Sequence, residues 1–156
     1  MTEINEVKQW IEPLIHLSNT SADVFIQEEN QNGRRIGGMY SMDTHTVTLY
    51  QKEIYSQAME FFPEQDRFRD YVRIICAHEL GHANDPYLTI LAYRLDKERD
   101  FLKRKKIELL IEVQAWKYAK IILTGLVPSA VFRKVRKESL FHYYETIDQL
   151  LKNQAA

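Results

Sequence analysis

The chain has 156 residues, 45% of them hydrophobic and 28% charged, which is the balance of a globular protein and predicts a single domain over residues 1–156. A formal net charge of -1 provides no overall field to attract nucleic acid, and no stretch approaches the roughly 18 apolar residues of a membrane span. The single cysteine, Cys76, excludes an internal disulfide framework, and the N-terminal segment lacks a signal-peptide pattern, so we expect a cytoplasmic protein.

The first part of the chain predicts a helix followed by a small sheet. Apolar residues recur at helical spacing over residues 2–17, where Thr2 can cap the helix and Pro13 predicts a kink or an early end. Strand-like segments follow at residues 23–29, 36–42 and 44–51, with the turn-forming sequence NQNGRR between the first two. We expect a three-stranded antiparallel sheet whose last strand could lie at an edge.

The rest of the chain has helical periodicity. A helix is expected from about Glu64 to the sequence ANDP, where proline disfavours helix at the residue before it. A shorter helix is expected over residues 87–96, a long one over residues 97–123, and a final one from near Ser129 to about Lys152. The order of elements predicts an α+β fold, in which a small sheet packs with several helices.

The sequence IICAHELGHANDP contains the pattern His-Glu-x-x-His on the helix that begins near Glu64. Residues four apart lie on one face of a helix, so His78 and His82 can direct two imidazoles at one ion. Glu79 lies beside them, where it could reach water at that ion and act as a general base. Glycine inside a helix costs about 1 kcal/mol relative to alanine, and a close approach by substrate or a neighbouring backbone would explain Gly81.

A catalytic zinc site needs a third protein ligand and an open position. The motif does not continue with a third histidine, since residue 88 is Leu, and the long helix offers two glutamates one turn apart. Small side chains at Ala115 and Ala119 extend the face of Glu112 and would let this helix pack closely on the motif helix. Glu108 is the alternative, either as the ligand, as an acceptor that orients a histidine, or as a surface residue paired with lysines.

The sequences AHELGHAND and EVQAWKYA together resemble the ImmA/IrrE-type zinc metallopeptidases over roughly residues 36–126. The resemblance implies a zincin-like fold of the class whose third zinc ligand is a glutamate. It implies His78, His82 and Glu112 as Zn²⁺ ligands and Glu79 as the general base. It further implies a protein substrate in the cytoplasm, such as a repressor or another regulator.

The expected activity is therefore hydrolysis of a peptide bond by metal-activated water. The last helix carries the sequence FHYYE, from which His142 or Tyr143 could stabilise the oxyanion. Substrate could lie extended against the strand HTVTLY. The basic runs KRKK and RKVRK are typical of solvated helix faces, so we expect no nucleic-acid partner. The alternative function is an inactive zincin that regulates a partner by binding it.

Overall fold

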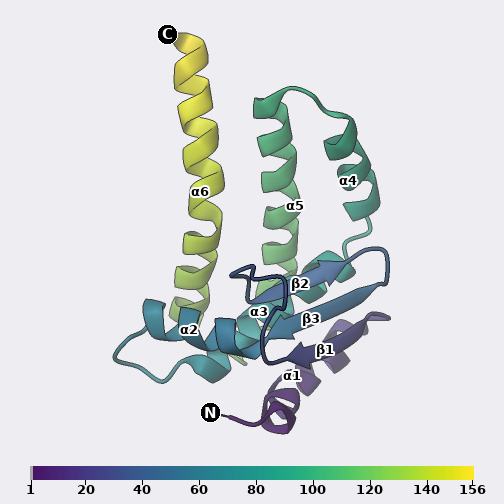
Figure 1. The fold of residues 1–156 in the computed structure, drawn as a ribbon, viewed down its shortest axis with the longest axis vertical. Coiled ribbons are helices and arrows are strands. Elements are labelled where there is room, and N and C mark those ends of the chain that lie inside the picture. Colours follow the sequence, from purple (N-terminus) through teal and green to yellow (C-terminus); the bar gives the residue numbers. More distant parts are fainter. Residues whose placement is uncertain (1) are drawn as a thin grey trace.

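The computed structural model describes residues 2–156 and has the predicted α+β composition, with helices and one small sheet (Figure 1). The helices are α1 (Ile4–Ser18), α2 (Gln51–Phe61), α3 (Phe68–Ala83), α4 (Leu88–Lys97), α5 (Phe101–Ile122) and α6 (Ser129–Ala155). The strands are β1 (Asp23–Gln27), β2 (Gly38–Ser41) and β3 (Thr46–Tyr50). Among the described residues, no helix has both the length and the hydropathy needed to cross a bilayer.

The sheet is mixed, so the prediction of an antiparallel sheet is wrong. The strand order is β1-β3-β2, with β1 parallel to β3 and β2 antiparallel to β3. β3 therefore lies at the centre of the sheet, and the prediction of an edge position for it is also wrong. Its residues from Val47 to Tyr50 are all buried, which suits a strand with a neighbour on each side, whereas β1 alternates between exposed and half-buried positions.

Helix α2 is absent from the predicted elements. It follows β3 directly, and its N-cap residue, Tyr50, makes no side-chain capping hydrogen bond. The sequence therefore lacks both the turn and the capping residue that usually mark the start of a helix. Ile54 and Ala58 lie one turn apart and are buried, so α2 packs one face on α3.

The ends of α1 differ from the predicted ones. The N-cap residue is Glu3 rather than Thr2, and it makes no side-chain capping bond. Pro13 does not end the helix, which continues to Ser18 and stops at Asn19, a residue with the left-handed φ of 48° that commonly follows a helix.

Helix α5 begins at Phe101 rather than at residue 97. The carboxylate of Asp100 accepts a hydrogen bond from the backbone N–H of Lys103 at 2.8 Å, which caps the helix there. The other predicted helices agree with α3, α4 and α6 to within a few residues at each end.

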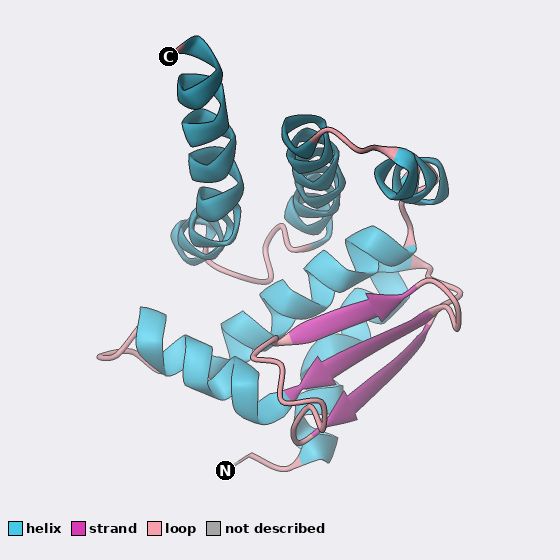
Figure 2. Ribbon diagram, turned by 45° about the horizontal axis from the view of Figure 1, so that its top comes forward, coloured by secondary structure: helices cyan, strands magenta, loops and turns pink. Residues whose placement is uncertain are grey.

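Helix α3 occupies the centre of the fold. It packs against α1, α2 and α5 and against strands β2 and β3, and Figure 2 shows it behind the sheet. Its buried side chains join those of β3, α1 and α5 in one hydrophobic core that includes Leu14, Leu49, Leu80 and Trp116. Helices α5 and α6 extend away from the sheet, with α4 packed along α5 (Figure 1). The central position of α3 places the His-Glu-x-x-His sequence beside the hydrophobic core, which includes Ala77 and Leu80.

Candidate metal centre

The three predicted metal ligands come together from two helices. His78 and His82 lie one turn apart on α3, and Glu112 reaches them from α5. One carboxylate oxygen of Glu112 lies 2.9 Å from Nε2 of His78, and the other lies 3.3 Å from Nε2 of His82. The side chains of the two histidines are only 12% and 11% exposed, so this cluster is largely shielded from solvent.

The approach of α5 to α3 depends on Gly81. A Cβ atom on Gly81 would lie 2.5 Å from the carbonyl oxygen of Ala115 and 2.9 Å from its Cα. Ala115 and Ala119 are fully buried, so the two helix backbones are in direct contact. This agrees with the expectation that a neighbouring backbone explains the glycine. Because Glu112 lies one turn before Ala115, the same contact sets how far the carboxylate reaches toward the histidines.

Glu79 lies on the other side of His78. Its carboxylate is 3.2 Å from Nδ1 of His78, and the residue is only 7% exposed. A Cβ atom on Gly38 of β2 would lie 2.9 Å from Cγ of Glu79, so the strand can lie against this side chain only because residue 38 is glycine. Glu79 is therefore enclosed between α3 and the first residue of β2.

Either carboxylate could in principle complete the ligand set. His78, Glu79 and His82 offer ligand atoms that all lie within 4.8 Å of one another. Glu112 is nevertheless the better third ligand, because its two oxygens face the Nε2 atoms of both histidines, whereas Glu79 contacts Nδ1 of His78. Glu79 is thereby left beside the metal ligands, as a general base requires.

The carboxylate of Glu112 and the imidazole of His78 shift one another's ionisation. Burial lowers the pKa of His78, but hydrogen bonds to Glu112 and Glu79 outweigh it and raise this pKa to about 10. Burial favours protonation of Glu112, yet its bonds to His78 and His82 hold the carboxyl pKa well below the usual range. A buried carboxylate must be neutralised by a proton on its neighbours or by a metal ion, and two imidazoles with one carboxylate are a ligand set that Zn²⁺ accepts.

Glu108, the alternative ligand, points elsewhere. Its carboxylate lies 2.8 Å from Nζ of Lys105 in a partly buried ion pair within α5. This matches the surface role considered for it, and the geometry favours Glu112 over Glu108 as the third ligand.

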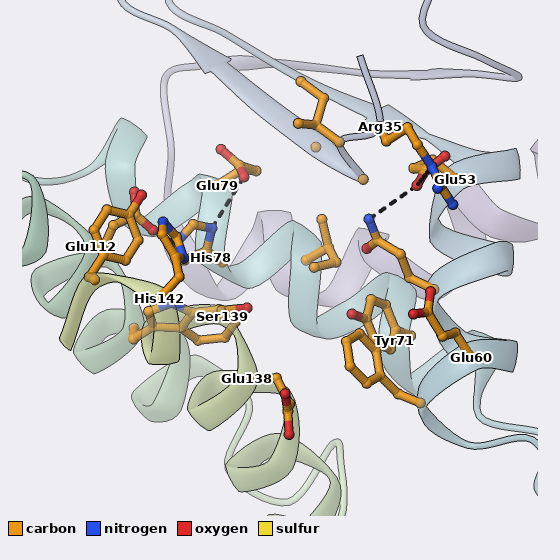
Figure 3. A pocket seen from close by; sticks show the side chains of 18 residues that line it. Arg35, Glu53, Glu60, Tyr71, His78, Glu79, Glu112, Glu138, Ser139 and His142 are labelled. Carbon is orange, nitrogen blue, oxygen red and sulfur yellow. Dashed lines mark hydrogen bonds and ion pairs between the residues drawn. The ribbon is translucent and has the colours of Figure 1, made fainter. Parts of the chain in front are cut away.

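His142 and Tyr143 of α6 line the same cleft as the candidate metal ligands, and Figure 3 shows His142 there. Their ring centroids are 3.9 Å apart, with His142 exposed and Tyr143 partly buried against the core. Burial, with smaller contributions from Glu112 and Glu108, raises the pKa of Tyr143 to about 12, so its hydroxyl remains a hydrogen-bond donor at neutral pH. Both residues predicted to stabilise an oxyanion are thus placed at the cleft.

The cleft has a volume of about 580 Å³ and runs along α3 from His78 past Ile75 to Tyr71. Several of its lining residues were not predicted from the sequence: the indole of Trp116, whose ring centroid lies 4.5 Å from that of His78, and residues of β2 and α2. The adjacent glycines 37 and 38 in a strand-like segment were the available signal for a close approach. No such signal was available for α2, because the helix itself was not predicted.

Comparison of the chain with protein-family models, curated proteins and solved structures gave no match. The chemistry of the site is therefore the basis for assigning a function.

Proposed function

We propose that the chain is a zinc-dependent endopeptidase of the ImmA/IrrE type, with a zincin-like arrangement of its helices. His78, His82 and Glu112 would hold Zn²⁺, and Glu79 would act as the general base. The observation that carries the proposal is the carboxylate of Glu112, which reaches from a separate helix to face the Nε2 atoms of both motif histidines. Chance spacing of two histidines on a surface helix would not explain this third, buried partner.

The residues around the ligands fit peptide hydrolysis. Zn²⁺ in such a site supplies Lewis-acid polarisation of a carbonyl and makes water more acidic. Glu79 would accept a proton from the attacking water and deliver it to the amine that leaves. Tyr143, protonated at neutral pH, could donate a hydrogen bond to the developing oxyanion, with His142 as the alternative donor.

The substrate would be an extended segment of a protein, such as a regulator. The strand HTVTLY does not offer a docking edge, because β3 is paired on both sides, so that part of the prediction is wrong. β2 has its outer edge unpaired within residues 2–156, and Gly37 and Gly38 line the cleft beside Glu79. A peptide that adds to this edge would gain main-chain hydrogen bonds beside the proposed metal ligands.

The metal proposal is tested by zinc content. Wild type, Glu112→Gln and the matched variant Glu108→Gln are reconstituted with Zn²⁺ and measured by elemental analysis. We expect about one zinc per chain in wild type and in Glu108→Gln, and a loss in Glu112→Gln, because an amide is a poor substitute for a carboxylate ligand. A wild-type chain that retains no zinc after reconstitution would contradict the proposal.

The catalytic proposal is tested with Glu79→Gln. Zinc-loaded protein is incubated with a mixture of unfolded proteins, and mass spectrometry identifies new chain ends. We expect wild type to produce cuts and Glu79→Gln to keep its zinc but produce none, since glutamine cannot accept the proton. Cutting by Glu79→Gln at the wild-type rate would refute the assignment of the base. A zinc-loaded wild type that never cuts would favour the inactive, partner-binding alternative.

A further inference from the structure

The end of the cleft away from the metal ligands carries carboxylates on two opposite walls (Figure 3). Glu53 and Glu60 extend from α2, and Glu138 extends from α6. Glu53 has a partner, since one of its carboxylate oxygens lies 3.7 Å from Nε of Arg35. Glu60 and Glu138 take part in none of the ion pairs formed by residues 2–156. Two carboxylates without a cation thus face one cavity.

A lysine near this end of the cleft is already engaged elsewhere. Lys134 of α6 donates a hydrogen bond to the backbone carbonyl of Phe61 at 2.7 Å, and its Nζ lies 4.8 Å from the ring centroid of Phe62. It therefore fastens α6 to the end of α2 and does not neutralise Glu60 or Glu138.

Tyr71 gives a second, independent indication of a ligand. It is only 3% exposed and lines the cleft, and Figure 3 shows its hydroxyl turned toward the space between the walls. Within the described chain the hydroxyl has no hydrogen-bond partner. Burial raises the pKa of Tyr71, and Glu60 and then Glu138 add to this, so both carboxylates act on the phenol. The hydroxyl is open to the cleft, so a bound donor or acceptor could become its hydrogen-bond partner.

The surroundings also suit the rest of a long cationic side chain. The ring of Phe61 stacks on that of Tyr71, with centroids 6.1 Å apart and planes 8° from parallel. Ile75 lies between Tyr71 and His78 along α3 and lines the same cleft. Lysine and arginine bury an apolar stem and keep a charged end, which matches an apolar and aromatic floor that ends between two carboxylates.

The spacing along α3 fixes where this cation would lie in a substrate. Tyr71 and His78 are seven residues apart, which is two helical turns or about 10 Å. An extended peptide covers about 3.3 Å per residue, so this distance corresponds to about three residues. We propose that the acidic end of the cleft, formed by Glu60, Glu138 and Tyr71, binds a lysine or arginine side chain about three residues from the bond that is cut. This inference rests on the proposed peptidase function for the position of the cut, but binding of the cation can be measured without cleavage.

Binding is tested on full-length Glu79→Gln, which is not expected to cut the probes. The probes are fluorescent heptapeptides of alanine whose central residue is lysine, arginine, norleucine or glutamate, and fluorescence polarisation measures their affinity. We expect the lysine and arginine peptides to bind at least about tenfold more tightly than the norleucine peptide, as for a charge-assisted hydrogen bond. The preference should weaken as salt is added, because Glu60 and Glu138 are solvent-exposed.

Two double variants are compared. The test pair combines Glu60→Gln with Glu138→Gln, and the control pair combines Glu64→Gln with Glu145→Gln, whose carboxylates lie outside the cleft lining. The first pair should abolish the preference and the second should keep it. Equal binding of the lysine and norleucine peptides by the protein, including no measurable binding of either, would overturn the inference. So would a preference that survives in the first pair.

Cleavage gives a second readout that separates this inference from the proposed function. Among the cuts made by zinc-loaded wild type, lysine or arginine should be enriched about three residues from the cut, and the enrichment should disappear in Glu60→Gln with Glu138→Gln. Cleavage without enrichment would refute the cation site and leave the peptidase intact. A lysine preference in binding without any cleavage would support the cation site and refute the peptidase.

Discussion

Replacing Gly81 with alanine tests the contact that brings the third ligand to the motif helix. In a helix interior without neighbours, this change should stabilise the protein by about 1 kcal/mol. Here the new methyl group would lie 2.5 Å from the carbonyl oxygen and 2.9 Å from Cα of Ala115, which are backbone atoms of a packed helix. Overpacking of a core costs about 1–3 kcal/mol, and the upper end applies because no side chain can rotate away. We therefore expect a net loss of about 2 kcal/mol.

The assay for Gly81→Ala is thermal unfolding, together with zinc titration. A net loss of about 2 kcal/mol lowers Tm by about 4–8 °C for a chain of this length. Zinc affinity should fall as well, because α5 must move away from α3 and takes Glu112 with it. Adding Ala115→Gly should not restore stability, since the clash involves atoms that every residue has. A Gly81→Ala protein as stable as wild type, or more stable, would refute the reasoning.

Three further predictions concern the packing and ionisation around α3. The Asn84 side-chain Nδ2 donates to the carbonyl of Ser18 at 2.9 Å and lies 2.7 Å from the hydroxyl of Tyr118. Asn84→Ala should therefore lower the free energy of unfolding, measured by urea titration, by about 1–3 kcal/mol. No loss would show that these bonds are dispensable. Burial raises the pKa of the Cys76 thiol, so a disulfide reagent at pH 8 should leave the folded protein unmodified and label one thiol per chain in denaturant; rapid labelling of folded protein would contradict its burial. Burial raises the pKa of Tyr143 from 10 to about 12, so its protonated phenol contributes to folding stability below pH 10, and this contribution is lost as the pH rises from 10 toward 12. In unfolding curves across that range, Tyr143→Phe should reduce the loss of stability. An unchanged loss would exclude Tyr143 as its source.

The sequence predicted the parts of the structure that have a local pattern. Helical periodicity located α3 and α5, and spacing alone placed His78 and His82 on one face. The preference for Glu112 over Glu108 came from two sources. The small residues Ala115 and Ala119 marked the face of α5 that could approach another helix, and the resemblance to the ImmA/IrrE-type peptidases implied Glu112.

The predictions that were wrong concern features that depend on contacts between distant segments of the chain. Whether β1 pairs with β2 or with β3 depends on where the ten-residue connection after Gln27 returns, and no local pattern specifies that. The walls of the cleft were missed for the same reason. Glu60 and Glu138 are 78 positions apart in the sequence and face one cavity only because α2, itself unpredicted, packs on α3.

The burial of α3 has a consequence for how the protein could be switched on and off. Opening α3 would expose the core of the whole molecule, so its residues should exchange their amide hydrogens only on global unfolding. The proposed metal ligands on α3 are thus unsuited to a switch that works by local melting. The cleft walls belong to the same core on their inner faces, since Ile54 and Ala58 of α2 and Val131 and Val135 of α6 are part of it. The floor and the walls of the cleft should therefore resist local opening together.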